Sequence, residues 1–393
     1  MSSLGHCVLA IALALMLASH AACSSERPDF AFFDACDPRQ VPDAACYAGK
    51  RHPASARVAL ATELALRFIE EHPAFEQEWN WEEGVLMYAM TELYRITDDV
   101  RIRDYYKAWI DHHIAESYSI FWSDSCPPAL AAIALHAELG DEVYGEVARE
   151  VLRYLAVDAL RTDEGGISHL GSFDLRTLWI DSLFMFGMVL TRWGEFDNDN
   201  GALDEMGDQL AIFADLLQSS SGLFVHAHDW PVNHDTDIYW GRGNSWVTVA
   251  TADYLRARLL RYQSDQRAQQ ILQSQIRGVL ETQDSTGAWW TVMNRPGDTY
   301  LEISATALLA YGMARAYRYG LASTEVLGPV ENAVAAVESA IVRDLQNRPL
   351  VTGISSPTGV GTFSQYARVP LQDDLSYGVG GAILALVESS GLP

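Results

Sequence analysis

The sequence predicts an all-α protein whose helices close into an (α/α)6 barrel of six helical hairpins. From about Pro53 to the C-terminus one helical pattern follows another, and no segment shows the alternation of polar and apolar residues typical of a half-buried strand. Twelve helical segments can be placed, and they alternate between two kinds of surface. One kind is amphipathic and the other is apolar nearly all round, as expected for an outer ring of helices packed around an inner ring.

The twelve helices are expected, in chain order, near residues 54–72, 82–97, 101–117, 126–139, 141–160, 174–194, 203–218, 240–262, 264–281, 300–320, 326–345 and 374–390. Charges gather on one face of four segments, which we assign to the outer ring: 57–71, 101–116, 141–158 and 265–281. Four others are apolar nearly all round and rich in Gly and Ala, so we assign them to the inner ring: 178–190, 246–252, 304–314 and 377–386. The spacing of the repeats is irregular, so a toroid with inserted loops is expected.

The first 23 residues are expected to be a signal peptide. Residues 8–19 form an apolar run too short to span a bilayer comfortably, and Ala21-Ala22-Cys23 follows as a small-residue cleavage region. The Ala-Ala-Cys run resembles a bacterial lipoprotein processing site with Cys23 as the lipidated residue, although His20 stands where an aliphatic residue is usual. We expect export to the periplasm, to the outer membrane as a lipoprotein, or to the medium, with membrane contact only through a lipid on Cys23.

Residues 24–53 are interpreted as a tether rich in Pro and Asp, and residues 54–393 as the barrel domain. Cys36 and Cys46 lie in the tether, where an oxidising compartment would favour a disulfide that closes a small loop. The competing interpretation is two unpaired thiols. Cys126 is expected to be free.

The charge of the chain limits its partners. A net charge of -25 is far too acidic for a nucleic-acid-binding protein, which needs a basic face to displace counterions from phosphates. An acidic chain also repels anionic ligands at long range, so a local cationic pocket has to receive any such ligand.

Residues 239–246 predict such a pocket. Arg242 stands between Trp240 and Trp246 where an apolar helical run begins, and Gly241 and Gly243 suggest a tight turn into the helix. The planar guanidinium suits bidentate binding of a carboxylate, and indole faces suit the C–H faces of a pyranose ring. The alternative is an arginine buried between tryptophans for packing alone.

Asp181 is the candidate catalytic residue, because it stands inside the apolar run 178–186. Desolvation there is expected to raise its pKa, and a carboxylic acid protonated near neutral pH can serve as a general acid. An equally suitable structural role for Asp181 is a helix N-cap or a buried hydrogen bond.

No cofactor or metal is expected. The run His226-x-His228-Asp229 is only a weak pattern for metal ligation, and in a carbohydrate site these imidazoles would hydrogen-bond hydroxyl groups instead. The segment Gly241-Arg242-Gly243 lacks the strand and spacing of a dinucleotide-binding turn, and no Gly-x-Ser-x-Gly elbow occurs.

An ordered set of motifs resembles the unsaturated rhamnogalacturonyl hydrolases of glycoside hydrolase family 105, whose near neighbours are the unsaturated glucuronyl hydrolases of family 88. The motifs are Trp79-x-Trp81-x-x-Gly84, Asp124, Leu178-Trp179-Ile180-Asp181, Trp240-Gly241-Arg242-Gly243-Asn244-x-Trp246 and Glu302-x-Ser304-Ala305-Thr306-Ala307. The resemblance runs from about residue 55 to the C-terminus. Both families have (α/α)6 barrels, in agreement with the helix count.

The resemblance implies a hydrolase that needs no cofactor and acts on the 4-deoxy-4,5-unsaturated uronic acid that polysaccharide lyases leave at a non-reducing end. In these families one aspartate protonates C4 and assists the addition of water at C5, after which the hemiketal opens and the remaining sugar leaves. Asp181 matches that residue and Asp124 matches a second carboxylate near the sugar. Matches to the positions that line the pocket are Trp79, His169, His226, Trp240, Arg242 and Trp246.

Three departures from the family pattern concern the sugar attached to the uronate more than the reaction. Leu170 follows His169 where a lysine is frequent, Ser245 replaces a usual glycine, and the run Cys126-Pro127-Pro128 comes after Asp124 where an asparagine and a glycine are typical. Three alternatives stay open: a family 88-like unsaturated glucuronyl hydrolase with another aglycone, an (α/α)6 sugar epimerase, and a non-catalytic glycan-binding lipoprotein.

Overall fold

The structure is a computed structural model that describes residues 55–171, 173 and 175–393. The predicted signal peptide and tether, with Cys23, Cys36 and Cys46, lie outside the described residues, so these expectations stay predictions. Cys126, the one cysteine among the described residues, is buried and free, as expected.

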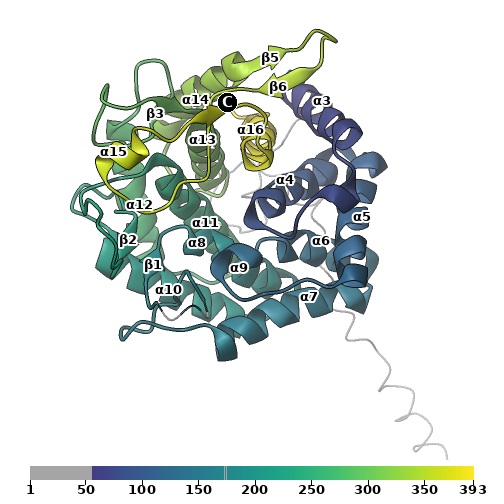
Figure 1. The fold of residues 1–393 in the computed structure, drawn as a ribbon, viewed down its shortest axis with the longest axis horizontal. Helices are drawn as coiled ribbons and strands as arrows, with labels where there is room; N and C mark the ends of the chain where they lie inside the picture. Colours follow the sequence, from purple (N-terminus) through teal and green to yellow (C-terminus); the bar gives the residue numbers. More distant parts are fainter. Residues whose placement is uncertain (1–54, 172, 174) are drawn as a thin grey trace, which may run out of the picture. The chain divides into compact units, whose positions relative to one another are not determined.

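Two concentric rings of helices form the described part of the chain (Figure 1). The outer ring comprises α3 (Ala56–Glu71), α5 (Val100–Glu116), α7 (Glu142–Arg153), α10 (Asn200–Leu217), α12 (Gln266–Glu281) and α14 (Leu327–Ala340). The inner ring comprises α4 (Trp81–Thr97), α6 (Ala129–Leu139), α9 (Gly187–Phe196), α11 (Gly241–Leu260), α13 (Ile303–Arg318) and α16 (Ser376–Ser389). Each inner helix contacts the next, and α16 contacts α4, which closes the ring. The predicted (α/α)6 barrel is confirmed.

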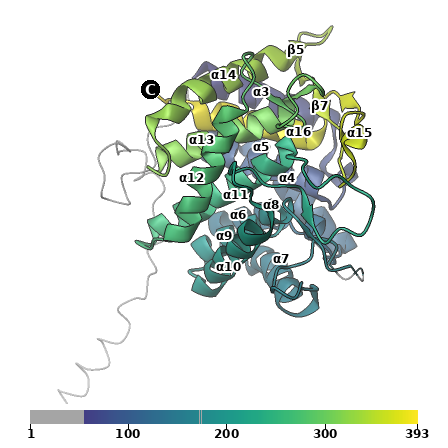
Figure 2. The same cartoon turned by 90° about the vertical axis from the view of Figure 1, so that its left-hand side faces the viewer.

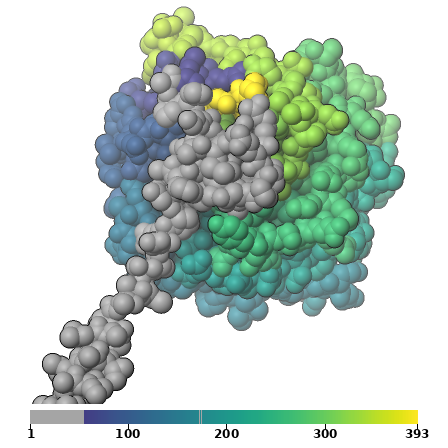
Figure 3. All heavy atoms as spheres, turned by 180° about the vertical axis from the view of Figure 1, so that it is seen from behind, coloured from purple at the N-terminus to yellow at the C-terminus, as the bar shows by residue number. Residues whose placement is uncertain are grey.

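The successive segments of the chain follow one another round the barrel, and the view from behind shows the same order of colours (Figure 3). Each outer helix packs on the inner ring: α5 on α4, α7 on α6, α10 on α9, α12 on α11, α14 on α13 and α3 on α16. Because the inner helices are covered on all sides, their residues are buried nearly throughout, as their composition predicts.

Local sequence explains where the helices begin. Five outer helices start behind a Ser or Asp whose side chain accepts a hydrogen bond from the first turn: Ser55, Asp99, Asp141, Asp199 and Asp265. By contrast α6, α11 and α16 have no side-chain cap. Their N-terminal ends keep the partial positive charge of a helix start.

The inner ring needs small residues where helices approach closely. A Cβ added to Gly380 of α16 would lie 2.9 Å from the Cα of Leu86 in α4, so only glycine fits at this crossing. At the neighbouring Gly381 the nearest atom would lie 3.5 Å away, which is an ordinary contact.

Short strands and turns fill the loops between helices. Within the residues that the structure describes, four two-stranded antiparallel sheets pair β1 (Leu178–Trp179) with β2 (Ala227–His228), β3 (Trp289–Trp290) with β4 (Leu301–Glu302), β5 (Ile341–Arg343) with β6 (Pro349–Val351), and β7 (Ile354–Ser355) with β8 (Leu371–Gln372). The remaining short helices are η2 (Ala74–Glu76), η3 (Ser123–Ser125), η4 (Tyr154–Asp158), α8 (Ser182–Met185), η5 (Thr324–Val326) and α15 (Phe363–Tyr366). Strands of two or three residues are too short to show an alternation in sequence.

One predicted helix is wrong in its first half. The segment 174–194 was expected to be a single helix, but β1 occupies 178–179 and helix begins only at Ser182, with α8 and α9 in succession. The cause is pairing with residues 227–228, supported by a hydrogen bond of 2.9 Å from Thr177 Oγ1 to the main-chain oxygen of His228. Asp181 therefore lies at the start of a helix and not inside one.

A buried ion network joins five of the six inner helices toward their C-terminal ends. Its carboxylates and guanidinium groups belong to Glu92, Arg192, Glu195, Asp253, Arg256, Arg315, Arg318 and Glu388, each no more than 7% exposed. Four acidic and four basic groups balance each other, which is the condition for burying charge without a large loss of stability. No helix in residues 55–393 combines the length and the apolar character of a membrane span.

Candidate active site

A cavity of about 310 Å³ opens where the inner helices begin. It is lined by Trp81, Trp122, Asp124, His169, Trp179, Asp181, Met185, Trp240, Arg242, Trp246, Pro357, Thr358 and Gly359. These residues come from the starts of α4 and α11, from β1, α8 and the loop before β1, and from the loops before α6 and between β7 and α15. In Figure 2 the elements β7 and α15, which flank the 357–359 loop, lie at the right-hand side of the barrel.

Pairing of β1 with β2 places Asp181. The main-chain N–H of Ile180 donates to the oxygen of His226 at 3.0 Å, so the two segments run side by side up to the helix start. Asp181 is 8% exposed, and its carboxylate makes no capping hydrogen bond to α8. Instead His226 Nε2 lies 3.1 Å from Asp181 Oδ2. The helix-cap role considered from sequence is therefore wrong, and the carboxylate faces the cavity.

Asp124 reaches the same cavity from η3, the short turn before α6. The N–H of Ser123 donates to the oxygen of His169 at 3.0 Å, which ties this turn to the loop before β1. Ser182 Oγ lies 3.1 Å from Ser123 Oγ and 3.0 Å from His169 Nδ1. Hydrogen bonds thus hold the two aspartate-bearing segments together, although 57 positions separate Asp124 from Asp181 in sequence.

The two carboxyl groups have opposite pKa shifts. Burial raises the pKa of Asp124 well above its usual value, and the negative charges of Asp181 and Glu82 reinforce the effect. Burial acts in the same direction on Asp181, but the hydrogen bond from His226 and the electrostatic interactions with His226 and His169 outweigh it, so the pKa of Asp181 is lowered. The expectation of a raised pKa at Asp181 is wrong. Asp124 therefore holds a proton more strongly than Asp181 does.

The two predicted histidines stand beside the two carboxyl groups. His169 Nε2 lies 3.6 Å from Asp124 Oδ1, and its ring stacks on Trp179 with centroids 4.5 Å apart. Burial lowers the pKa of His169 to about 4, so its ring is neutral at neutral pH. His226 does not line the cavity itself but contacts it through its hydrogen bond to Asp181.

Arg242 lines the cavity, but its terminal nitrogens are already occupied. Nη1 donates to the main-chain oxygen of Ser355 at 2.7 Å, and Nη2 donates to that of Ser356 at 3.0 Å. The guanidinium carbon lies 4.9 Å from the ring centroids of Trp240 and of Tyr377. Arg242 therefore fixes the loop after β7, and a bidentate clamp on a substrate carboxylate, as expected from its planar fork, would require these hydrogen bonds to break.

Trp240 and Trp246 line the cavity as expected, whereas Trp79 does not. Trp79 precedes α4, and its ring stacks on Tyr118 with centroids 4.0 Å apart. Its indole nitrogen donates to the main-chain oxygen of Ser125 at 3.0 Å. Trp79 thus lies outside the cavity and supports the turn that carries Asp124. Trp81, the first residue of α4, lines the cavity instead.

Comparison with known proteins agrees with this geometry. The sequence profile of Glycosyl Hydrolase Family 88 matches residues 62–392. The chain belongs to this family. It is therefore a glycoside hydrolase, as the resemblance of its motifs to families 105 and 88 implies.

Relatives with assigned activities match this family 88 hydrolase over most or part of its length. The unsaturated rhamnogalacturonyl hydrolase YesR of Bacillus subtilis is 27% identical over 334 residues, which cover 83% of this chain and 94% of the relative. An unsaturated 3S-rhamnoglycuronyl hydrolase of Alteromonas is 25% identical over 57% of this chain and 54% of the relative.

Solved structures match as well. A Salmonella enterica protein described as a possible member of family GH105 is similar with a TM-score of 0.75 and 25% identity, over 86% of this chain and 96% of that protein. The family 105 glycoside hydrolase of C. acetobutylicum has a TM-score of 0.77 at 21% identity, over 84% of this chain and 99% of that one, and shares the fold.

Sequence reasoning missed several residues of the family 88 site. Trp81, Trp122 and Trp179 line the cavity, and each stands in a motif next to a residue that had been chosen. Tyr366 of α15 hydrogen-bonds His226 Nδ1. No sequence signal could have found Tyr366, because it follows His226 by 140 positions.

Metal ligation has no support in the described part of the chain, where no three His, Cys, Asp or Glu side chains converge. His228 Nε2 lies 3.4 Å from Asp229 Oδ2 at the surface of the loop, apart from the catalytic cavity.

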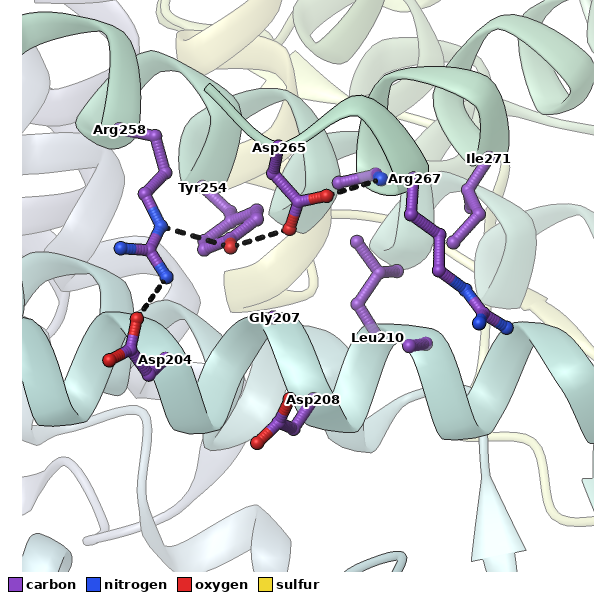
Figure 4. Close-up of a pocket in the computed structure, with 11 residues that line it drawn as sticks. Asp204, Gly207, Asp208, Leu210, Tyr254, Arg258, Asp265, Arg267 and Ile271 are labelled. Atoms are coloured by element: carbon purple, nitrogen blue, oxygen red, sulfur yellow. Dashed lines mark hydrogen bonds and ion pairs between the residues drawn. The ribbon is translucent and has the colours of Figure 1, made fainter. Parts of the chain in front are cut away.

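A second cavity of the hydrolase, of about 410 Å³, lies between the outer helices α10 and α12 over Tyr254 of α11 (Figure 4). Several of its polar side chains pair with one another: Arg258 Nη2 lies 2.5 Å from Asp204 Oδ1, and the Tyr254 hydroxyl donates to Asp265 at 2.8 Å. We assign no catalytic role to this cavity.

Proposed function

We propose that this enzyme removes 4-deoxy-4,5-unsaturated uronic acid from the non-reducing end of lyase-generated oligosaccharides by hydration of the C4=C5 double bond. The observation that carries the proposal is a buried pair of carboxyl groups, Asp124 and Asp181, whose pKa values are shifted in opposite directions in a cavity lined by tryptophans. Relatives that bear the names of unsaturated rhamnogalacturonyl and rhamnoglycuronyl hydrolases support this choice of substrate.

The reaction requires one acid and one base. The substrate is an enol ether, so protonation of C4 leaves a cation at C5 that the ring oxygen stabilises. Water then adds to C5 and loses a proton. The hemiketal opens by cleavage of the bond between C5 and the ring oxygen, and the hemiacetal at C1 expels the remaining sugar as an alcohol. The proton delivered to C4 is replaced by the proton lost from water, so the enzyme returns to its starting state.

Asp181 is proposed as the acid and base of this sequence, with Asp124 as its partner. In the free site Asp124 holds a proton more strongly than Asp181 does, because their pKa values are shifted in opposite directions. A uronate carboxylate that enters the cavity adds a negative charge, which raises the pKa of nearby carboxyl groups. Asp181 then takes up a proton from solvent and delivers it to C4.

Recognition of the uronate is proposed to combine stacking and electrostatics. Trp240, Trp246 and His169 line the cavity, and their rings are proposed to contact the sugar. Arg242 and the uncapped start of α11 supply positive potential, although the arginine's terminal nitrogens contact main-chain oxygens. His226 acts through Asp181, and Trp79 through the turn that carries Asp124.

A panel of unsaturated disaccharides prepared with pectin, ulvan and glycosaminoglycan lyases tests the proposal. Hydration destroys the conjugated double bond, so ultraviolet absorbance falls as the aglycone is released. Asp181→Asn should abolish the decay, and the saturated disaccharide is the control. Decay at the wild-type rate in the Asp181→Asn variant would refute the role of Asp181. No decay with any unsaturated disaccharide would refute the activity and favour an epimerase or a glycan-binding protein.

We further propose that the protein is exported, on the strength of residues 8–19 and the Ala-Ala-Cys run. Expression in a Gram-negative host followed by fractionation and mass spectrometry decides the matter. A diacylglycerol mass on an N-terminal Cys23 establishes the lipoprotein, and a mature protein with an unmodified Cys23 excludes lipidation. An intact Met1 on cytoplasmic protein would refute export.

A further inference from the structure

A tyrosine outside the cavity is linked to Asp181 through His226. Tyr366 Oη lies 2.5 Å from His226 Nδ1, and His226 Nε2 lies 3.1 Å from Asp181 Oδ2. All three residues are at most 8% exposed, and of the three only Asp181 lines the cavity. Both ring nitrogens of His226 therefore take part in a buried series of hydrogen bonds, here called the Tyr366 chain, which ends at the carboxylate of Asp181.

The hydroxyl group of Tyr366 is the donor in its hydrogen bond to His226. Burial raises the pKa of Tyr366, so the phenol keeps its proton at neutral pH. A main-chain hydrogen bond from Gly361 acts against this shift, as expected when an N–H group donates to the phenol oxygen. Because the oxygen already accepts a hydrogen bond there, its own proton is left for His226 Nδ1.

The donor role of Tyr366 determines where the ring proton of His226 lies. A neutral imidazole has one N–H group and one nitrogen with a lone pair, so the partner of one nitrogen fixes the role of the other. When Nδ1 accepts from Tyr366, the proton is on Nε2 and is donated to Asp181 Oδ2. The other tautomer would point a lone pair at the Asp181 carboxylate. The lowered pKa of Asp181 agrees with the first arrangement.

The surroundings of Tyr366 keep its hydroxyl group in place. The main-chain N–H of Phe363, the first residue of α15, donates to Asp235 Oδ2 at 2.6 Å. This hydrogen bond ties the short helix to the loop that follows β2. The ring of Tyr366 belongs to a buried apolar cluster whose other members are Ile238, Trp240 and Val292.

Arg242 and β8 hold the base of the same segment. Helix α15 lies between β7 and β8, and Arg242 donates to the main-chain oxygens of Ser355 and Ser356, where β7 ends. Gln372 Nε2, in β8, donates to Ser356 Oγ at 2.7 Å. The position of Tyr366 is therefore set by the fold and needs no ligand to order it.

We infer that Tyr366 is a positioning residue for the hydration reaction: its hydroxyl group donates to His226 Nδ1, which fixes the tautomer that donates from Nε2 to Asp181 and so orients the carboxylate that protonates C4. The inference rests on the proposed function and adds to it a residue that does not line the cavity. Because the phenol keeps its proton, Tyr366 orients Asp181 and does not supply the proton that Asp181 delivers.

Kinetics with an unsaturated disaccharide test the role of the hydroxyl group. Tyr366→Phe keeps the ring and should lower kcat by about three- to tenfold, the rate equivalent of one hydrogen bond, while KM is unchanged because Tyr366 does not contact the sugar. Tyr105→Phe is the matched control and should leave kcat unchanged. Tyr105 of α5 is 6% exposed, and its hydroxyl group donates to the main-chain oxygen of His72 at 2.7 Å, apart from the cavity.

A double-mutant cycle tests whether Tyr366 acts through His226. If it does, Tyr366→Phe should lower kcat in the wild-type background and have no further effect in the His226→Leu background. An equal loss in both backgrounds would refute the inference, because the hydroxyl group would then act by another route. Thermal unfolding of each variant shows whether the fold is retained.

Nuclear magnetic resonance on the free enzyme reads the tautomer without any substrate. The 15N resonances of the His226 ring are those that disappear in His226→Leu. At about pH 8, above the ordinary pKa of imidazole, the wild type should carry the ring proton on Nε2 and show Nδ1 as a hydrogen-bond acceptor. In Tyr366→Phe the Nδ1 resonance should move to the position of a free acceptor.

The outcomes separate this inference from the proposed function. Wild-type enzyme that turns over no unsaturated disaccharide refutes the proposed function, whatever the tautomer of His226. Turnover by the wild type together with a ring proton on Nδ1 refutes the inference alone, as does an equal kcat for Tyr366→Phe and the wild type. A loss of kcat in Tyr105→Phe as large as that in Tyr366→Phe would also refute it, because the loss would then not depend on His226.

Discussion

Asp253→Asn should destabilise the barrel strongly, although Asp253 lies far from the cavity lining. Asp253 of α11 is fully buried and accepts hydrogen bonds of 2.8 Å from Arg256 Nε and from Arg315 Nη1. It also forms an ion pair of 2.9 Å with Arg192 Nε. Asparagine retains an oxygen that accepts hydrogen bonds but removes the negative charge. The ion network is then left with four guanidinium groups and three carboxylates in a region closed to water.

The magnitude follows from the burial. Removing one partner of a buried ion pair costs about 3–5 kcal/mol of unfolding free energy. With about 2.1 cal/mol/K per residue over the roughly 340 described residues, the unfolding entropy is about 0.7 kcal/mol/K. The Tm of Asp253→Asn should therefore fall by about 4–7 °C.

Scanning calorimetry on the purified wild type and variant measures the shift. Asp204→Asn is the matched control, because Asp204 pairs with Arg258 at 2.5 Å but is 66% exposed (Figure 4). An exposed ion pair contributes less than about 1 kcal/mol, so the Tm of this variant should change by no more than about 1.5 °C. Equal Tm values for Asp253→Asn and the wild type would show that the network does not stabilise the barrel.

Three further predictions concern pH and packing. The pKa of His169 is lowered to about 4, so between pH 6.5 and pH 4 the unfolded chain binds a proton that the native ring does not. This one group should lower the free energy of unfolding by about 3 kcal/mol over this range, so His169→Gln should lose less stability than the wild type in calorimetry at the two pH values. Equal losses would contradict this. His226→Leu removes the hydrogen bond that lowers the pKa of Asp181. The descending limb of the plot of kcat/KM against pH should therefore move to higher pH by about one unit. An unmoved limb would show that Asp181 does not carry the essential proton. Gly380→Ala should lower the free energy of unfolding by about 1–3 kcal/mol, measured by chemical denaturation, because its Cβ meets the backbone of α4. Gly381→Ala should leave the free energy of unfolding unchanged, and equal effects of the two substitutions would refute the packing argument.

The fold was predictable because the inner and outer helices differ in sequence. Long apolar segments with Gly and Ala alternate with amphipathic ones, and this alternation alone gives the two rings and the number of helices. The error at 174–194 arose from pairing with β2, which lies about 50 residues further along the chain. A pattern within one segment contains no information on a partner so distant.

The site was predictable in its residue types and less so in its electrostatics. Asp181 was found because it is a polar residue in an apolar segment. The sign of its pKa shift depends on His226, which the pairing of β1 with β2 places 3.1 Å from its carboxylate. Trp79 and Trp81 stand two positions apart in one motif, and only the start of α4 decides which ring enters the cavity. Arg242 lines the cavity as predicted, but its role as a carboxylate clamp did not take account of its main-chain partners, which lie more than 110 positions away.

The most direct test of the central claim is to follow the reaction in D2O with an unsaturated disaccharide that the enzyme accepts. Nuclear magnetic resonance measures the deuterium at C4 of the product, and ultraviolet absorbance measures the double bond in the same sample. Hydration through Asp181 predicts one deuteron at C4 and aglycone release at the same rate as loss of absorbance, with both absent in Asp181→Asn. Release of the aglycone while the double bond persists and C4 stays unlabelled would contradict the account, because it would place the chemistry at the anomeric carbon.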